Sequence, residues 1–135
     1  MKTYSTQNIR NVVLLGSTKA GKTTLSEAML YEGKVIDRRG TVEGKNTVSD
    51  NAEIEQMNQR SIYATPLYAE FMDTKFNIID TPGADDFVGG AVSAFKVCDT
   101  GVLVVNAQQG VEVGTQIFSR YAKEYKIPLI VAVNQ

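Results

Sequence analysis

The sequence predicts an α/β fold of three layers, in which a mostly parallel sheet lies between helices and carries an additional strand at its edge. Short continuous runs of Val, Ile and Leu, typical of strands buried on both faces, alternate with segments of helical periodicity. Pro66 lies inside a further extended segment, and proline interrupts a hydrogen-bond ladder, so this strand is expected at an edge. The predicted central strands are residues 12–15, 76–79, 101–105 and 129–133, and the predicted edge strand is 61–71.

Helices are predicted between these strands from the spacing of apolar residues. Residues 21–32 carry an apolar stripe, and residues 112–126 carry a second one that includes two tyrosines. An aromatic stripe at this spacing is typical of core packing, so the tyrosines are assigned to the core rather than to a cofactor. A third helix is expected at about residues 86–97. The two stripes consist of Leu25, Ala28 and Met29 and of Val113, Ile117, Tyr121 and Tyr125.

The composition is that of one globular domain. The chain has 135 residues, 43% of them hydrophobic and 21% charged, which indicates a single core and neither disorder nor a membrane protein. The formal net charge of −1 predicts no nucleic-acid site spread over this chain. The single cysteine, Cys98, is expected to pack in the core. Without a disulfide or an apolar signal region in the sequence, we expect a cytoplasmic protein.

The segment at residues 16–23, G-S-T-K-A-G-K-T, matches the phosphate-binding loop pattern G-x-x-x-x-G-K-[ST] and follows a predicted buried strand. Such a loop, placed between a strand and a helix, directs backbone N–H groups and the helix N-terminus at polyphosphate. Lys22 is expected to reach the β- and γ-phosphates, and Thr23 to offer its hydroxyl to Mg²⁺. A strand-to-helix turn without a ligand is the alternative. The predicted nucleotide-binding residues are Gly16, Ser17, Thr18, Lys19, Ala20, Gly21, Lys22, Thr23 and Thr24.

A second motif, Asp80-Thr81-Pro82-Gly83, follows the predicted strand at residues 76–79. Open α/β sheets bind ligands at the carboxyl ends of their strands, so this motif is expected near the phosphate loop. Asp80 can hold Mg²⁺ through water, and Gly83 can bring a backbone N–H close to a γ-phosphate. Taken alone, the motif is a weak signal that a bare turn would also explain, but its position favours the nucleotide site.

Residues 33–59 have no sustained apolar periodicity and contain several glycines and basic side chains. We predict a long loop here, at about residues 33–60. Loops of this length without structure are uncommon in compact domains and are often functional. The segment is either a solvated surface loop or a switch that responds to a ligand, and the nearby D-T-P-G motif favours the switch.

Together these motifs resemble the translational GTPases, and most closely the GTP-binding domain of elongation factor G, over nearly the whole chain. The similarity includes A-G-K-T-T at residues 20–24, F-N-I-I-D-T-P-G at 76–83 and D-T-G-V-L-V-V-N-A at 99–107. The resemblance implies GTP and GDP as ligands and Mg²⁺ as a cofactor. It also implies a ribosome-dependent factor in which GTP orders two switch segments, at about residues 33–63 and 80–91.

The sequence departs from this family at the positions that serve hydrolysis and metal sensing. Ala84 stands where the family has the histidine that positions the attacking water, and Tyr63 stands where a switch threonine contacts Mg²⁺. Lys19 replaces an aspartate of the phosphate loop, and its ammonium is either a built-in cation near the phosphates or an exposed loop side chain. Of the guanine-reading motif Asn-Lys-x-Asp only Asn134 is present, with Gln135 in the place of its lysine.

The sequence therefore predicts the guanine-nucleotide-binding domain of an elongation factor G-like translation factor that acts in translocation, as a fragment truncated at its C-terminal end. A methyl group at Ala84 cannot orient water, so GTP hydrolysis is expected to be weak or lost while binding persists. The alternatives are a fully active ribosome-stimulated GTPase, of the translocase or ribosome-protection type, and another P-loop ATPase or kinase. Beyond the phosphate loop, the predicted nucleotide site comprises Asp80, Thr81, Pro82, Gly83, Ala84 and Asn134, with Thr23 and, through water, Asp80 at the metal. The expected partners are the ribosome and guanine nucleotide, with no membrane.

Overall fold

The computed structural model describes residues 3–134, so Gln135 lies outside the described part of the chain. The strands are β1 (Ile9–Leu15), β2 (Thr65–Phe71), β3 (Thr74–Asp80), β4 (Thr100–Asn106) and β5 (Leu129–Asn134). They form one sheet in the order β2-β3-β1-β4-β5. Its neighbouring strands are parallel except β2, which runs antiparallel to β3.

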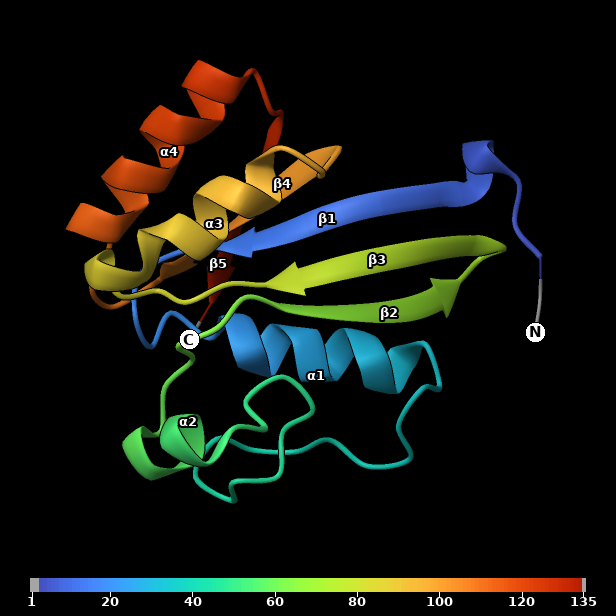
Figure 1. Cartoon of the computed structure of the whole chain (residues 1–135), viewed down its shortest axis with the longest axis horizontal. Helices are drawn as coiled ribbons and strands as arrows, with labels where there is room; N and C mark the ends of the chain where they lie inside the picture. Colours follow the sequence, from blue (N-terminus) through green and yellow to red (C-terminus); the bar gives the residue numbers. More distant parts are fainter. Residues whose placement is uncertain (1–2, 135) are drawn as a thin grey trace.

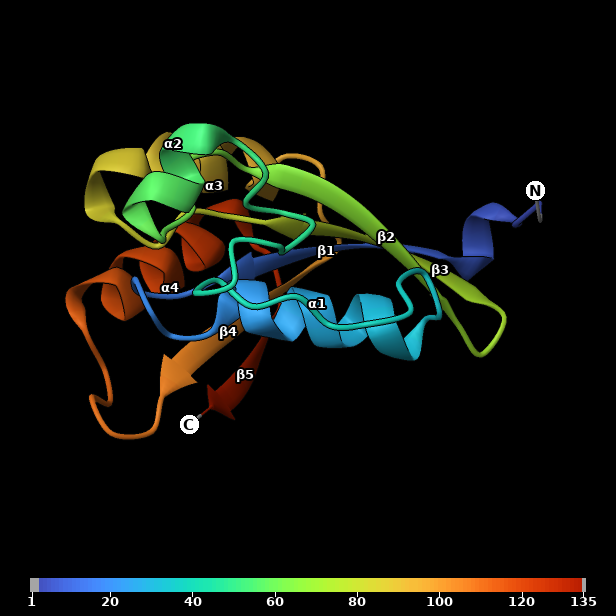
Figure 2. The same cartoon turned by 90° about the horizontal axis from the view of Figure 1, so that it is seen from below.

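Helices lie on both faces of this sheet. They are α1 (Lys22–Glu32), α2 (Glu53–Asn58), α3 (Val88–Phe95) and α4 (Val113–Tyr125), with 3₁₀ turns at Thr6–Asn8 and Asp85–Phe87. α1 packs on one face, and α3 and α4 pack on the other (Figure 1). Figure 2 shows α1 running alongside β1 and β3 when the molecule is seen from below. The three-layer α/β prediction is confirmed.

The central strand β1 contributes to the core on both faces because successive side chains of a strand point to opposite sides. Val13 and Leu15 pack against the helices α3 and α4. Val12 and Leu14 pack on the opposite face, together with partly buried side chains of α1. This double burial explains the continuous apolar run in the sequence, and it holds the end of β1 rigidly.

Cys98 belongs to the core cluster beneath α3 and α4, as predicted. Burial raises the pKa of its thiol, which lowers the fraction of reactive thiolate. We expect a maleimide reagent to label Cys98 at least about a hundredfold more slowly in native buffer than in urea, because labelling needs local opening. Mass spectrometry of the peptide that contains Cys98 measures this, and equal rates in the two solvents would contradict the packing.

The two edges of the sheet differ from one another. β2 is an edge strand with Pro66 inside it, as predicted, but it begins at Thr65 rather than at residue 61. β5 was predicted as a central strand buried on both faces, and this prediction is wrong. Within the described residues it pairs only with β4. Its apolar side chains are therefore largely exposed, with Val133 70% accessible.

The apolar stripes predicted for the two longest helices are only partly confirmed. In α1, Leu25 and Met29 are half-buried against the sheet. The fully buried positions of α1 are mostly polar, because the side of the helix on which they lie faces the segment of residues 33–60. In α4 the two tyrosines pack against the core, and Tyr125 stacks on Phe95, but Val113 is 63% exposed. The buried residues of α1 are Lys22, Thr23, Ser26, Glu27 and Leu30.

The segment predicted as a loop over residues 33–60 contains the short helix α2, which the sequence analysis missed. The physical reason is that α2 buries no apolar stripe, since Ile54 and Met57 are exposed and the buried residue is Glu55. The rest of the segment is turns and irregular chain that fold back over α1, as Figure 1 shows.

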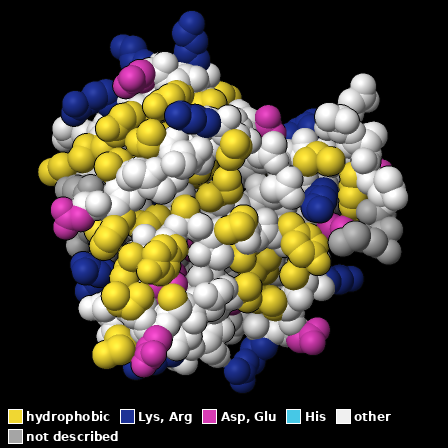
Figure 3. All heavy atoms as spheres, in the orientation of Figure 1, with side chains coloured by type: hydrophobic (Ala, Val, Ile, Leu, Met, Phe, Trp, Pro, Cys, Tyr) yellow, Lys and Arg dark blue, Asp and Glu magenta, His cyan; other side chains and the backbone are white. Residues whose placement is uncertain are grey.

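The surface carries charges of both signs. On the face shown in Figure 3, Lys and Arg side chains are interspersed with Asp and Glu, including along α4 at the upper edge. This mixture fits the formal net charge of −1. Among the helices of residues 3–134, none is long and apolar enough to cross a membrane.

Candidate functional site

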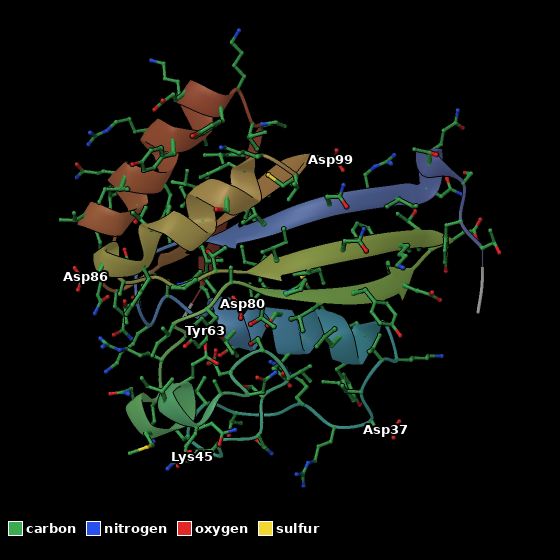
Figure 4. All side chains as sticks on the ribbon, viewed as in Figure 1. Asp37, Lys45, Tyr63, Asp80, Asp86 and Asp99 are labelled. Atoms are coloured by element: carbon green, nitrogen blue, oxygen red, sulfur yellow. The ribbon has the colours of Figure 1, made fainter. Side chains whose placement is uncertain are left out.

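The phosphate-loop sequence and the D-T-P-G motif meet at the carboxyl ends of two neighbouring parallel strands. Leu14 of β1 is in register with Asp80, the last residue of β3. The chain leaves β1, turns through residues 16–21 and enters α1, so Asp80 lies beside the start of that helix (Figure 4). In the same view Tyr63 lies on the segment between α2 and β2, whereas Asp37 and Lys45 lie on the outer side of the long loop, which here means residues 33–64 between α1 and β2.

The phosphate loop contains left-handed backbone at two positions that matter for its shape. Gly21, the N-cap of α1, has φ 97°. A Cβ at Gly21 would lie 2.1 Å from the side-chain amide nitrogen of Asn134, so a larger residue would require the Asn134 side chain to shift. Lys19 adopts φ 63°, a conformation that costs free energy in residues other than glycine. The loop thus turns tightly into the N-terminus of α1, where backbone N–H groups attract anions.

Lys22 is buried and braces the phosphate loop. Its Nζ donates hydrogen bonds to the carbonyl oxygens of Gly16, at 3.0 Å, and Ser17, at 2.9 Å. A lysine ammonium carries three protons, so one remains for a ligand. Burial lowers the pKa of Lys22 to about 8, although Asp80 and Asp50 favour the charged form. A nearby polyphosphate would favour the ammonium further, so the site is chemically suited to an anion.

Thr23 connects the start of α1 with the end of β3. Its hydroxyl donates to Asp80 Oδ2 at 2.9 Å and lies 3.2 Å from Ser61 Oγ. Ser26, one turn further along α1, also reaches Asp80 Oδ2, at 3.4 Å. Asp80 is 1% exposed. This burial raises the pKa of its carboxyl to about 6, although the nearby Ser49, Lys22 and Thr23 side chains favour the ionised form.

The residues around Thr23 fit a hard cation. Asp80 Oδ1 and Asp50 Oδ2 are buried carboxylate oxygens that make no hydrogen bond within residues 3–134. Such oxygens are costly to bury unless water or a cation takes the open position. Magnesium ions bind one or two carboxylates together with hydroxyl, water and phosphate oxygens. Thr23, Asp50 and Asp80 therefore suit a Mg²⁺ that a nucleotide phosphate would complete.

A cavity of about 470 Å³ lies between the phosphate loop and the long loop. Its volume is within the range of small-molecule pockets. Asp50, Arg60 and Ser61 contribute to its wall from the long loop, and Asn106 contributes from the end of β4. Of the predicted site residues, the cavity is lined by Thr18, Lys19, Gly21, Lys22, Thr23, Thr24 and Gly83.

The other predicted site residues do not line the cavity. The Thr81 hydroxyl donates to the backbone carbonyl of Leu14, which fixes the D-T-P-G segment to β1. The Asn134 amide donates to the carbonyl of Ala20 at 3.1 Å, which ties the end of β5 to the phosphate loop. These two contacts support the phosphate-binding site without lining the cavity. The remaining predicted residues outside the lining are Gly16, Ser17, Ala20, Asp80, Pro82 and Ala84.

Gly83 packs so closely on the phosphate loop that only glycine fits. A Cβ there would lie 2.4 Å from Lys22 Nζ and 2.6 Å from the carbonyl carbon of Ser17. The next residue, Ala84, is half-buried and caps the 3₁₀ turn Asp85–Phe87. Its methyl group has no hydrogen-bonding atom, so this position cannot orient a water molecule.

Two buried glutamates, which the sequence analysis missed, anchor the long loop. Glu27 of α1 accepts hydrogen bonds from the backbone N–H groups of Gly40, at 2.7 Å, and Val48, at 2.6 Å. Glu55 of α2 accepts from the two successive amides of residues 62–63, at 2.9 and 3.0 Å. The sequence carries only a weak signal for these anchoring roles, because a glutamate on a helix is ordinarily exposed to solvent.

Replacing Glu27 with glutamine is expected to loosen the loop, because glutamine offers one acceptor oxygen where two amides need one each. Hydrogen bonds to a charged group are worth about 1.5–3 kcal/mol. We therefore expect the amide of Gly40 or Val48 to exchange with deuterium at least about tenfold faster. Hydrogen-exchange mass spectrometry measures this, with Glu32→Gln on the exposed side of α1 as the control. Unchanged protection in Glu27→Gln would contradict the anchoring.

The chain matches the family described as the elongation factor Tu GTP-binding domain over residues 7–135. It is 40% identical over 130 residues to the oxytetracycline resistance protein of Streptomyces rimosus, a match that covers 95% of this chain and 19% of that protein. It is 35% identical over 127 residues to an elongation factor G-like protein of Mycobacterium tuberculosis, a match that covers 94% of this chain and 18% of that protein. The chain thus spans about a fifth of the length of these relatives.

Among solved structures, a crystal structure of a protein from Thermus thermophilus superimposes with a TM-score of 0.90 at 34% identity, over 93% of this chain and 19% of that one. Translation elongation factor SelB from Methanococcus maripaludis shares the fold, with a TM-score of 0.69 at 20% identity over 98% of this chain and 22% of that one. These matches confirm the resemblance that the sequence motifs indicated. The chain belongs to the elongation factor Tu GTP-binding domain family, and its relatives include elongation factor G-like and tetracycline resistance proteins.

Proposed function

We propose that this domain binds GTP and GDP with Mg²⁺ in the cavity over the phosphate loop, and that it does so within a longer factor that acts on the ribosome in the cytoplasm. The observation that carries the proposal is the arrangement of two adjacent residues of α1. Lys22 is anchored by two loop carbonyls with one proton left over, and Thr23 is held by the buried Asp80. An ammonium and a hydroxyl so fixed suit a nucleoside polyphosphate and its metal.

In this proposal different groups of the chain bind the phosphates, the metal and the base. The N-terminal amides of α1 and the Lys22 ammonium hold the phosphates, and the backbone N–H of Gly83 approaches the terminal one. Mg²⁺ would supply charge neutralisation between the phosphates, held by Thr23 and, through water, by Asp80. Asn134 would contribute to guanine recognition, with its contact to Ala20 placing it beside the phosphate loop.

We further propose that GTP hydrolysis by this domain is weak or lost. Phosphoryl transfer to water depends on orienting the water and on closing the switch segments over the phosphates. Ala84 has no group to orient water, and the Tyr63 side chain is 58% exposed while its backbone N–H is held by Glu55. Binding would then set the state of the factor on the ribosome without rapid cleavage.

A second candidate is an active ribosome-protection protein in which a residue outside this chain orients the water. The 40% identity to an oxytetracycline resistance protein favours it. Expression of the full-length protein in a tetracycline-sensitive strain separates the two candidates. Raised tetracycline tolerance supports protection, and unchanged tolerance with normal expression supports the factor proposed above. A P-loop ATPase or kinase is disfavoured by the family to which the chain belongs.

Competition binding tests the proposed function. The full-length protein is titrated with a fluorescent GTP analogue, and GTP, GDP and ATP are then added as competitors in the presence of Mg²⁺. We expect GTP and GDP to displace the probe and ATP to do so at least about a hundredfold more weakly, since a hydrogen-bonding base pocket rejects the wrong base strongly. Equal competition by ATP, or no cosedimentation with ribosomes in a non-hydrolysable GTP analogue, would contradict the proposal.

A further inference from the structure

Two hydroxyl oxygens face one another where the long loop meets the phosphate loop. Thr23 Oγ1 and Ser61 Oγ are 3.2 Å apart. Ser61 stands two residues before Tyr63, so the loop oxygen that approaches Thr23 does not come from the position at which the family resemblance places a threonine. The Tyr63 side chain is mostly exposed and its backbone is fixed to Glu55.

The proton of the Thr23 hydroxyl is already used. Thr23 donates its proton to Asp80 Oδ2 at 2.9 Å. Burial raises the pKa of the Asp50 carboxyl, and the nearby Ser61 hydroxyl opposes that rise. A hydroxyl has one proton and two lone pairs, so Ser61 Oγ is the group that can donate to Thr23 Oγ1. A cation that bound both oxygens through their lone pairs would take the place of this hydrogen bond.

The spacing of these oxygens fits a magnesium ion. Ligands of Mg²⁺ lie at about 2.0–2.1 Å in an octahedron, so two adjacent ligand oxygens are about 3 Å apart. The separation of 3.2 Å between Thr23 and Ser61 is close to this edge length. The unpartnered oxygens Asp80 Oδ1 and Asp50 Oδ2 are buried in the same region, and Ser61, Asp50 and Thr23 line the same cavity.

We propose that Ser61, and not Tyr63, supplies the oxygen by which the long loop binds the nucleotide-associated Mg²⁺ next to Thr23, in the cavity that Asp50 also lines. This inference rests on the proposed nucleotide and metal site. It gives the long loop a means of sensing the metal, because Ser61 directly precedes the two amides that Glu55 holds. When nucleotide and Mg²⁺ bind, Ser61 then holds the long loop against α1.

The test measures how nucleotide affinity depends on the Mg²⁺ concentration. The full-length protein, as wild type and as Ser61→Ala, Ser61→Thr, Tyr63→Phe and Thr23→Ala, is titrated with a fluorescent non-hydrolysable GTP analogue, first in EDTA and then with Mg²⁺ up to about 10 mM. We expect Ser61→Ala to raise the Mg²⁺ concentration for half-maximal tightening by about tenfold, while Ser61→Thr restores it. Tyr63→Phe is expected to match the wild type.

The controls separate this inference from the function on which it rests. Equal affinity of Ser61→Ala and wild type in EDTA shows that the variant is folded and binds the phosphates. If Thr23→Ala loses the Mg²⁺ effect while Ser61→Ala keeps it, the metal site stands and the role of Ser61 is wrong. A shift in Tyr63→Phe instead of Ser61→Ala also overturns the inference. If neither Thr23→Ala nor Ser61→Ala alters the Mg²⁺ dependence, the metal part of the proposed function fails as well.

Discussion

Replacing Lys22 with alanine is expected to weaken the binding of both GTP and GDP by roughly a hundredfold, which corresponds to about 2.7 kcal/mol. Two losses combine in this variant. The charged contact to the phosphates disappears, and the carbonyls of Gly16 and Ser17 lose the donor that spans them. The phosphate loop then becomes both less positive and less rigid, so its amides no longer converge on the ligand.

Equilibrium titration with a fluorescent nucleotide measures the effect of Lys22→Ala. Lys96→Ala is the matched control, since Lys96 is exposed at the end of α3 and lies outside the cavity. The control should bind like the wild type. If Lys22→Ala retained wild-type affinity with an unchanged circular dichroism spectrum, the phosphate site would have to lie elsewhere.

Replacing Ala84 with histidine is expected to raise ribosome-stimulated GTP hydrolysis by at least about a hundredfold, because a positioned general base or water-orienting group contributes about 10²–10⁴ in rate. The position suits this gain. Ala84 directly follows Gly83, whose backbone packs against Lys22 and Ser17. It is half-buried at the start of a 3₁₀ turn, and the neighbouring Gly83 lines the cavity.

The control for this gain is Ala84→Leu, which adds bulk without a hydrogen-bonding group. Rates are measured in single turnover with full-length protein and ribosomes, and nucleotide affinity is measured in parallel. A gain in Ala84→His that Ala84→Leu shares would point to a packing effect rather than to water orientation. No gain in either variant would mean that more than the residue at position 84 limits hydrolysis, with the Tyr63 position next in question.

The sequence was sufficient for the parts of the fold that depend on local pattern. The apolar run at residues 12–15 predicted the central strand, and Pro66 predicted the edge strand. The pattern G-x-x-x-x-G-K-[ST] located Lys22 and Thr23 at one cavity. The register of β1 and β3 then placed Asp80 within hydrogen-bonding distance of Thr23, as the order of strand and motif predicted.

Features that depend on long-range polar contacts could not be predicted. α2 has no apolar stripe and is held by Glu55, whose partners are backbone amides that carry no sequence signal. The burial of β5 depends on what lies beside it, and an apolar run such as residues 129–133 does not specify that. The approach of Ser61 to Thr23 joins residues 38 positions apart, and it becomes visible only when the long loop is folded onto α1.

Single-turnover GTP hydrolysis by the full-length wild-type protein, with and without ribosomes, tests most directly whether nucleotide binding here has been separated from nucleotide cleavage. A conventional elongation factor G, assayed at the same ribosome concentration, provides the reference rate. We predict that the protein binds GTP under these conditions but cleaves it at least about a hundredfold more slowly than the reference, as expected when the water-orienting group is missing. Ribosome-stimulated cleavage at the reference rate would contradict this account.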